Sequence, residues 1–324
     1  MIFLRLYIIG KIIMSLSFKE TKNSRPIAIV DGGNHAGKMV WLSEDHNLLG
    51  GAAEINPSTL LDPSIFHEGK RNFTQAEIQQ IHHAIKAGYA SPEILADVRL
   101  GGLFQKAKGS LAEKAGREIK LSSGKFQPLP MDVEGQREVL QIGAPSGAGK
   151  SYFASRYADV YHTMFPDRPI LLLSRKNEDQ QFDKFPFIKR VDLESIVEHK
   201  FEPEELRNHL LIFDDIETLD SPVKEAVYAL KDDMLITGRS YNIAMLLVTH
   251  LTRAGHQTKI DNNESTGTVV FKHGNAMHNR ALLKDYIGLD KKTVDKILAS
   301  NSRWMMIHKH VPMYCLTENE VFLI

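Results

Sequence analysis

Residues 139–151 read VLQIGAPSGAGKS, and this stretch decides the fold. Its first four residues are mostly apolar and predict a short buried strand. A glycine-rich turn follows, with Ala144 near its start, and Lys150 and Ser151 then begin an amphipathic helix. A turn of this composition between a strand and a helix can direct backbone N–H groups at an anion. We therefore expect a phosphate-binding loop at the carboxyl end of a buried strand.

This turn matches the Walker A pattern, except that Ala144 stands where the pattern usually has its first glycine. The expected nucleotide-binding residues in the turn are Pro145, Ser146, Gly147, Ala148 and Gly149. Lys150 is expected to reach the β- and γ-phosphates, and the Ser151 hydroxyl is expected to bind Mg²⁺. The motif predicts ATP and Mg²⁺ as cofactors.

A second motif, LLIFDDIETLD, occupies residues 210–220. Four apolar residues followed by two carboxylates form a Walker B strand, so Asp214 is expected to hold Mg²⁺. Asp215 lies where many ATPases place the residue that activates water. Aspartate is one methylene shorter than the usual glutamate, so Glu217 remains an alternative for that role.

A third motif is TGRSYNIAMLLVTH, residues 237–250, in which an apolar strand ends at Thr249 and His250. If this strand lies between the two Walker strands, His250 is close to the γ-phosphate and can sense hydrolysis. Arg239, which precedes the strand, is a candidate arginine finger for the site of a neighbouring subunit. The alternative is that Arg239 is an ordinary surface arginine.

From residue 131 onward, short apolar strands alternate with amphipathic helices, which predicts an α/β domain with a parallel sheet covered by helices on both faces. The expected strands are residues 139–142, 170–173, 210–213, 245–248 and 268–271, and the expected helices include 150–164 and 222–237. Residues 304–310, 314–316 and 321–324 predict a small antiparallel addition at the C-terminal end.

Residues 1–130 predict a smaller α+β domain. Residues 25–43 suggest two strands joined by a glycine-rich turn, and Thr74 with Glu77 forms a capping box that begins a helix. Ser91 and Pro92 open a second helix. Residues 101–130 are rich in lysine and glycine, and we interpret them as a basic linker or as the edge of a domain, which puts the domain boundary near residue 130.

The first 18 residues are strongly apolar but contain Arg5 and Lys11. Such a stretch is short for a bilayer-spanning helix and lacks the order of a signal peptide. One interpretation makes Met14 the natural start, with residues 1–13 an upstream extension; a packed first strand and a membrane-associated segment are the alternatives.

The composition narrows the class of protein. The chain has 324 residues with 40 basic and 40 acidic side chains, which argues against a protein that merely coats nucleic acid. Its one cysteine, Cys315, cannot form an intramolecular disulfide, so a secreted disulfide scaffold is excluded and a reducing compartment is expected.

The order of these motifs resembles that of the FtsK/HerA superfamily of RecA-like (ASCE) P-loop NTPases. Within it, the chain is most similar to genome-packaging ATPases of large double-stranded DNA viruses, including the poxvirus type, and of virophages. The matching segments are APSGAGKS, LLIFDD, GRSYNIAMLLVTH, ESTGTVVF, RALLKDYIG and KHVPMYCLTENEV. The similarity covers about residues 137–324. Asp215 stands where the family has a glutamate, and His250 stands where glutamine is frequent.

The resemblance implies an ATPase that forms a homo-oligomeric ring, a pentamer or hexamer, and moves double-stranded DNA into a capsid. It implies catalytic roles for Lys150, Asp214, Asp215, Arg239 and His250. Capsid vertex proteins and an internal membrane are further candidate partners, and the virion or the host-cell cytoplasm is the expected location. Residues 252–259 and the turn 174–177 are candidate DNA contacts.

Two other functions stay open on the sequence. A related ring ATPase could act on protein or membrane in phage-type assembly or secretion, which the apolar N-terminal stretch favours. A P-loop small-molecule kinase is the second alternative, although the chain shows no arginine-rich lid.

Overall fold

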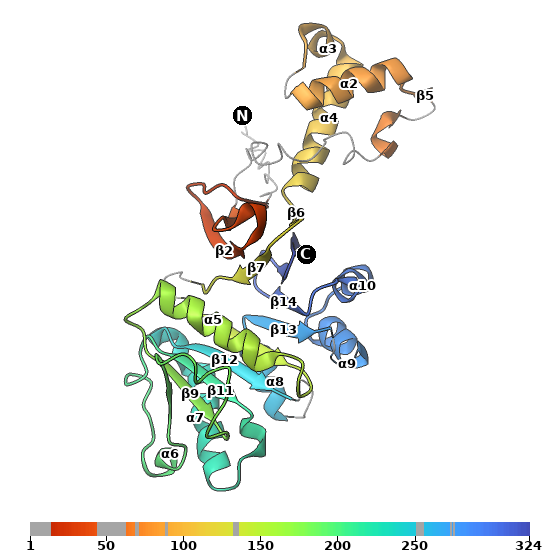
Figure 1. The fold of residues 1–324 in the computed structure, drawn as a ribbon. Helices are drawn as coiled ribbons and strands as arrows, with labels where there is room; N and C mark the ends of the chain where they lie inside the picture. Colours follow the sequence, from red (N-terminus) through yellow and green to blue (C-terminus); the bar gives the residue numbers. More distant parts are fainter. Residues whose placement is uncertain are drawn as a thin grey trace, which may run out of the picture. The chain divides into compact units, whose positions relative to one another are not determined.

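The computed structural model describes residues 14–43, 63–68, 71–87, 90–131, 136–250, 256–272, 274 and 276–324. The chain forms two compact units, each of which is described by itself (Figure 1). The larger unit comprises Ile27–Lys38 and Leu121–Phe322 with Ile324, and the smaller comprises Met1–Pro26 and Met39–Lys120 with Leu323. In the described part of the chain, no helix is long and apolar enough to cross a membrane.

The larger unit is built on one sheet. Its own strands lie in the order β10-β9-β11-β12-β8-β13-β14-β15-β16. Pairing is parallel from β10 to β13 and antiparallel from β13 through β14 to β15. The strands are β8 (Val139–Gly143), β9 (Ile170–Ser174), β10 (Ile188–Arg190), β11 (Leu210–Asp214), β12 (Ala244–Thr249), β13 (Gly267–Phe271), β14 (Trp304–His308), β15 (Tyr314–Thr317) and β16 (Glu320–Leu323). The predicted strands, the parallel sheet and the antiparallel addition are confirmed.

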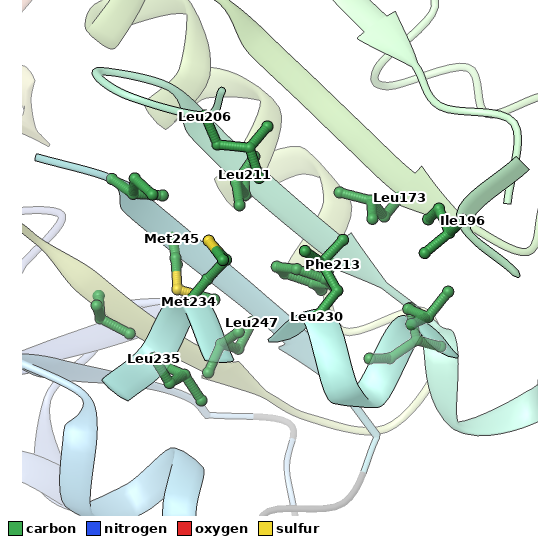
Figure 2. Close-up of a cluster of buried hydrophobic side chains, with 14 residues drawn as sticks. Leu173, Ile196, Leu206, Leu211, Phe213, Leu230, Met234, Leu235, Met245 and Leu247 are labelled. Carbon is green, nitrogen blue, oxygen red and sulfur yellow. The ribbon is translucent and has the colours of Figure 1, made fainter. Parts of the chain in front are cut away.

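Helices cover both faces of this sheet. Alternate residues of β11 and β12, among them Phe213 and Leu247, pack against α7 (Val223–Thr237) in a cluster that also contains Leu230 and Met234 (Figure 2). The helix α5 (Lys150–Met164) contacts β8, β11 and β12 with side chains that are not in this cluster, so it covers the other face. The chain therefore has the expected α/β fold, a mostly parallel sheet with helices on both faces.

Shorter helices complete the larger unit. A second cluster of buried side chains joins β13, β14 and β15 to the helices near the C-terminus. The remaining helices of this unit are η1 (Gly33–His35), α6 (Ser195–Glu198), η4 (Ile216–Thr218), η5 (Gly238–Tyr241), α8 (His256–Glu264), α9 (Ala276–Ala281), the π-helix η6 (Leu282–Tyr286) and α10 (Lys291–Ala299).

The N-terminal strands pair as the sequence predicts. Strand β2 (Ser24–Asp31) leads into a tight turn in which Gly37 N–H donates to Val30 O at 2.9 Å, and β3 (Met39–Ser43) follows. Strand β1 (Ser15–Ser17) pairs antiparallel with β3, and β7 (Lys125–Pro128) pairs antiparallel with β2.

The smaller unit also contains a helical cluster with its own core. Its elements are η3 (Pro63–Phe66), β4 (His67–Glu68), β5 (Arg71–Asn72), α2 (Gln75–Ala87), α3 (Pro92–Ala96), α4 (Val98–Ala115) and β6 (Glu118–Lys120). The capping box before α2 is confirmed, because Thr74 N donates to Glu77 Oε2 at 2.6 Å and Glu77 N donates to Thr74 Oγ1 at 3.3 Å. Ser91 caps α3 through the Ile94 N–H.

The interpretation of residues 101–130 as a basic linker is wrong. Most of this stretch belongs to α4, β6 and β7. Leu103, Phe104 and Ala107 lie within one turn of α4 and are buried in the core of the smaller unit, which stabilises the helix despite its glycines and lysines. The boundary predicted near residue 130 stays a prediction, and the proposed extension 1–13 lies outside the described residues.

Candidate active site

The three sequence motifs meet at the carboxyl edge of the parallel sheet. Strand β12 lies between β11 and β8, with Val248 opposite Asp214 and Thr249 opposite Gly143. The turn after β8, the acidic pair at the end of β11 and the polar end of β12 are therefore neighbours. Ligands of open α/β sheets bind at this edge.

The turn after β8 has the backbone that a phosphate-binding loop needs. Gly147 and Gly149 have φ values of +77° and +106°, which side chains other than glycine rarely adopt. A Cβ on Gly147 would meet no atom within 4 Å, so this side of the turn is open. Ala144 N–H donates to Thr249 O at 3.2 Å, which links the turn to the end of β12.

Lys150 is the first residue of α5, and its side chain is buried under the turn. Its Nζ donates to Ala144 O at 2.7 Å and to Pro145 O at 3.3 Å. Burial lowers the pKa of Lys150, and the carboxylates of Asp215 and Asp214 partly offset that shift. Ser151, the predicted Mg²⁺ ligand, is the next residue of the helix and is partly exposed.

Asp214 ends β11 and is 1% exposed. Its Oδ2 accepts a hydrogen bond from Ser174 Oγ at 3.2 Å, whereas Oδ1 is buried and has no hydrogen-bond partner among the described residues. Burial, followed by the charge of Asp215, raises the pKa of Asp214 to about 6. An orphaned carboxylate oxygen beside a phosphate-binding turn fits the coordination shell of a divalent cation.

Asp215 has a left-handed backbone, with φ at +54°, which directs its side chain back toward the site. Its Oδ1 lies 2.6 Å from His250 Nε2, and its Oδ2 lies 2.7 Å from Lys176 Nζ. Burial raises the pKa of Asp215, but the hydrogen bond and charge of Lys176 outweigh it, so the pKa is lowered overall. Asp215 is thus held in its charged form between two cationic or ionisable groups.

Glu217 lies in η4, directly after the acidic pair. Its Oε1 accepts hydrogen bonds from the Thr249 hydroxyl and, at 3.1 Å, from the His250 N–H. Its Oε2 is buried without a hydrogen-bond partner in the described part of the chain. Glu217 therefore fastens the end of β12 to the end of β11.

Arg239 does not join this group of side chains. It is exposed in η5, which precedes the amino end of β12, while the motif residues lie at the carboxyl end. The six residues of β12 alone separate the two ends by roughly 20 Å at the usual rise of a strand. Arg239 cannot act on the site of its own chain, and its role in a neighbouring subunit's site stays a prediction.

The sequence did not identify Ser174 and Lys176 as site residues. The turn 174–177 was expected as a candidate DNA contact, yet both side chains contact the acidic pair. Only the position of β9 could have indicated these two residues. If β9 and β11 are adjacent parallel strands, their carboxyl ends lie side by side. The other candidate DNA contact, 252–259, falls partly outside the described residues; Thr258 and Lys259 belong to α8.

Among the described residues, no group of three or more histidine, cysteine, aspartate or glutamate side chains is arranged to hold a metal ion. The features that fit a bound metal and nucleotide are the open face of Gly147, the orphaned Oδ1 of Asp214 and the adjacent Ser151.

Comparison with known sequences finds a relative from a virophage. No family model matches the chain. An uncharacterized protein, V3, of the Sputnik virophage is 30% identical over 225 residues, which are 68% of this chain and 91% of V3. Its virophage origin agrees with one of the groups that the order of the motifs indicated.

Comparison with solved structures finds a genome-packaging NTPase, a secretion ATPase and a conjugation coupling protein, all at low identity. The genome-packaging NTPase B204 of Sulfolobus turreted icosahedral virus 2, in complex with AMPPCP, is 13% identical with a TM-score of 0.39, covering 57% of this chain and 99% of B204. The cytoplasmic domain of the type VII secretion ATPase EccC of Thermomonospora curvata is 12% identical with a TM-score of 0.43, covering 62% of this chain and 28% of the EccC chain. The conjugation coupling protein TcpA of pCW3 is 10% identical with a TM-score of 0.41, covering 90% of this chain and 76% of the TcpA chain.

Proposed function

This chain belongs to the same protein family as V3 of the Sputnik virophage. We propose that it is an ATP-hydrolysing motor that moves double-stranded DNA and packages a viral genome. The observation that carries the ATPase part is the meeting of Lys150, Asp214 and His250 at one edge of the sheet. The DNA part rests on the resemblance in the order of the motifs.

The nucleotide is held by the turn and by the start of α5. The N–H groups of Ser146, Gly147, Ala148 and Gly149 bind phosphate oxygens, and Lys150 exchanges its contacts with Ala144 O and Pro145 O for the β- and γ-phosphates. Ser151 and Asp214 would hold Mg²⁺. Bound Mg²⁺–ATP supplies the phosphoanhydride bond that is broken.

Asp215 orients the attacking water and accepts its proton. Its short contacts with His250 and Lys176 fix the direction of the carboxylate, and one of them has to lengthen before Asp215 can act as a base. Glu217 remains the alternative base, although its Oε1 is already used by Thr249 and by the His250 N–H. His250 contacts both Asp215 and Lys150, which suits a residue that senses the γ-phosphate.

A ring of identical subunits completes each site. Arg239 lies at the edge of the sheet opposite the phosphate-binding turn, so it can stabilise the transferred phosphoryl group only in the site of a neighbour. We propose a pentameric or hexameric ring around duplex DNA, acting in the virion or in the host-cell cytoplasm where virions assemble. Capsid vertex proteins or an internal membrane would anchor it.

The test is the rate of ATP hydrolysis with and without double-stranded DNA. We expect DNA to stimulate the wild type, Lys150→Ala to abolish the activity and Asp215→Asn to lower it by about 10²- to 10⁴-fold. Lys184→Ala, which removes an exposed lysine, is the control that should keep it. Activity that survives Lys150→Ala would contradict the site, and the absence of stimulation at every salt concentration would contradict the DNA motor. Stimulation by membranes or protein alone would support a secretion ATPase, and phosphorylation of a small molecule would support a kinase.

The ring has its own test. Light scattering in the presence of an ATP analogue is expected to give the mass of five or six copies. A particle that stays monomeric under these conditions would leave Arg239 without a site to act on.

A further inference from the structure

The turn after β9 contacts the end of β11 with three consecutive side chains. Ser174 Oγ donates to Asp214 Oδ2 at 3.2 Å, and Arg175 Nη1 donates to Thr218 O at 2.6 Å. Lys176 Nζ lies 2.7 Å from Asp215 Oδ2 and 3.9 Å from Asp214 Oδ2. No other part of the described chain brings an exposed cation this close to both members of the acidic pair.

The position of this lysine is fixed by further contacts. Lys176 O accepts a hydrogen bond from Arg190 Nη1 at 2.5 Å, and Lys176 N–H donates to Ser174 Oγ at 3.2 Å. Asp179 Oδ2 lies 3.7 Å from the ammonium group. The backbone of the turn is thus anchored at Lys176, while the side chain, 46% exposed, retains room to move.

Lys176 and a divalent cation would compete for the same two carboxylates, those of Asp214 and Asp215. The side chain of Asp214 is 1% exposed and that of Asp215 is 13% exposed, so two adjacent carboxylates lie in a poorly solvated place. Such a pair needs positive charge nearby, either from a side chain or from a metal ion. Lys176 supplies one positive charge at the Oδ2 oxygens, and a divalent cation bound to the pair would repel it across a few ångströms.

We propose that Lys176 is a positioning residue that competes with the divalent cation for the Asp214–Asp215 pair. When the cation binds, Lys176 moves away from Asp214, and its contact with Asp215 is the one that aligns that carboxylate for the attacking water. This inference rests on the proposed ATPase function, because it gives Lys176 a role in the same site.

The first test measures Mn²⁺ binding to the full chain without nucleotide. The electron paramagnetic resonance signal of free Mn²⁺ reports how much Mn²⁺ stays unbound. We expect Lys176→Met to bind Mn²⁺ about threefold to tenfold tighter than the wild type, because a nearby positive charge is removed. Lys176→Arg keeps the charge and should stay near the wild-type affinity. Lys184→Met removes an exposed lysine away from the acidic pair and should leave the affinity unchanged.

The second test is the division of the kinetic effect between KM and kcat. We expect Lys176→Met to lower kcat without raising KM for Mg²⁺–ATP, and we expect Lys176→Arg to restore most of the loss. A general loss of folding would lower the active fraction and could not make Mn²⁺ binding tighter. Lys176→Gln provides a second neutral variant for the same comparison.

The outcomes separate this inference from the proposed function. If the wild type hydrolyses ATP and Lys176→Met binds Mn²⁺ no tighter than the wild type, or does not bind it at all, the role of Lys176 is refuted and the ATPase stands. A wild type that does not hydrolyse ATP would refute the proposed function itself.

Discussion

His250 Nε2 lies 2.6 Å from Asp215 Oδ1, and the other ring nitrogen of His250 lies 3.4 Å from Lys150 Nζ. The end of β12 thus connects the lysine that we propose binds phosphate with the carboxylate that we propose orients water. The position of β12 between β11 and β8 makes this bridge possible. A change at the γ-phosphate can therefore reach Asp215 through one imidazole ring.

Replacing His250 by alanine is expected to slow hydrolysis more than it weakens ATP binding. The ring contacts Asp215 and Lys150 but belongs to neither the turn nor the helix that hold the phosphates. We expect kcat to fall roughly 10- to 100-fold, the range expected when a group that positions a base is lost. Steady-state ATPase assays and titration with a fluorescent nucleotide measure the two effects. His209→Ala, at a partly exposed histidine, is the control, and an equal loss of binding and turnover would contradict the bridge.

Asp215→Asn and Glu217→Gln are expected to differ in their effect on turnover. Asparagine at position 215 cannot accept a proton from water, and we expect a loss of about 10²- to 10⁴-fold in kcat. Glutamine at position 217 keeps an oxygen that can accept the Thr249 hydroxyl and the His250 N–H, so we expect a loss of about tenfold or less. Single-turnover hydrolysis measures both variants. The reverse order of effects would identify Glu217 as the base.

The strands and the phosphate-binding turn could be predicted from the sequence because they depend on local patterns. Continuous apolar runs marked β8, β9, β11, β12 and β13, and the glycines of the turn require positive φ values that few residues adopt. The position of β12 between the Walker strands was only a condition for His250 to lie near the γ-phosphate, and the strand order of the sheet meets that condition. The strands and the turn themselves do not need knowledge of distant contacts.

Other features depend on contacts between distant segments, and the sequence did not reveal them. Ser174 and Lys176 became site residues only because β9 pairs with β11. Helix α4 was mistaken for a linker because its glycines and lysines lower the helical signal, while Leu103 and Phe104 stabilise it through tertiary packing. Glu217 gained its role from the Thr249 hydroxyl, which no spacing rule indicates.

Gly238→Ala is expected to destabilise the larger unit although its φ of −61° suits any residue. A Cβ there would collide with Arg137 Nη1, and the Arg137 guanidinium donates to Met234 O and Leu235 O at the end of α7. Displacing this buried group leaves helix carbonyls unpaired, so we expect a loss of about 1–3 kcal/mol in unfolding free energy. Chemical denaturation measures it, with the exposed Ser240→Ala as the matched control. Equal stability of the two variants would contradict this role of Arg137.

Lys309 is expected to make stability depend on alkaline pH. Burial lowers the pKa of Lys309 to about 8, whereas an unfolded lysine titrates near 10.4. Between these values the unfolded chain binds more protons than the folded chain, so the free energy of unfolding rises as the pH increases from about 8 to about 10. Below about pH 8 Lys309 is charged in the folded chain, so the free-energy cost of burying its charge is fully present.

Lys309→Met should remove this rise, because methionine carries no charge to bury. Because the wild type gains stability with pH and the variant does not, the stability of the variant relative to the wild type should fall as the pH rises. The variant also loses the hydrogen bond from Lys309 Nζ to Asn262 O at 2.9 Å. Denaturation at pH 7.5 and pH 10 measures the difference, and Lys272→Met, at an exposed lysine that donates to Asn301, is the control. Parallel pH profiles for the wild type and Lys309→Met would contradict the prediction.

The central claim is that hydrolysis at Lys150 and Asp215 moves duplex DNA. Displacement of a third strand from a triplex at the end of a long duplex measures that movement directly, since the motor must travel along the DNA to release the strand. The wild type is expected to release it with ATP and not with a non-hydrolysable analogue, and Lys150→Ala is expected to release none. A wild type that hydrolyses ATP at full rate and leaves the triplex in place at every salt concentration would contradict the account.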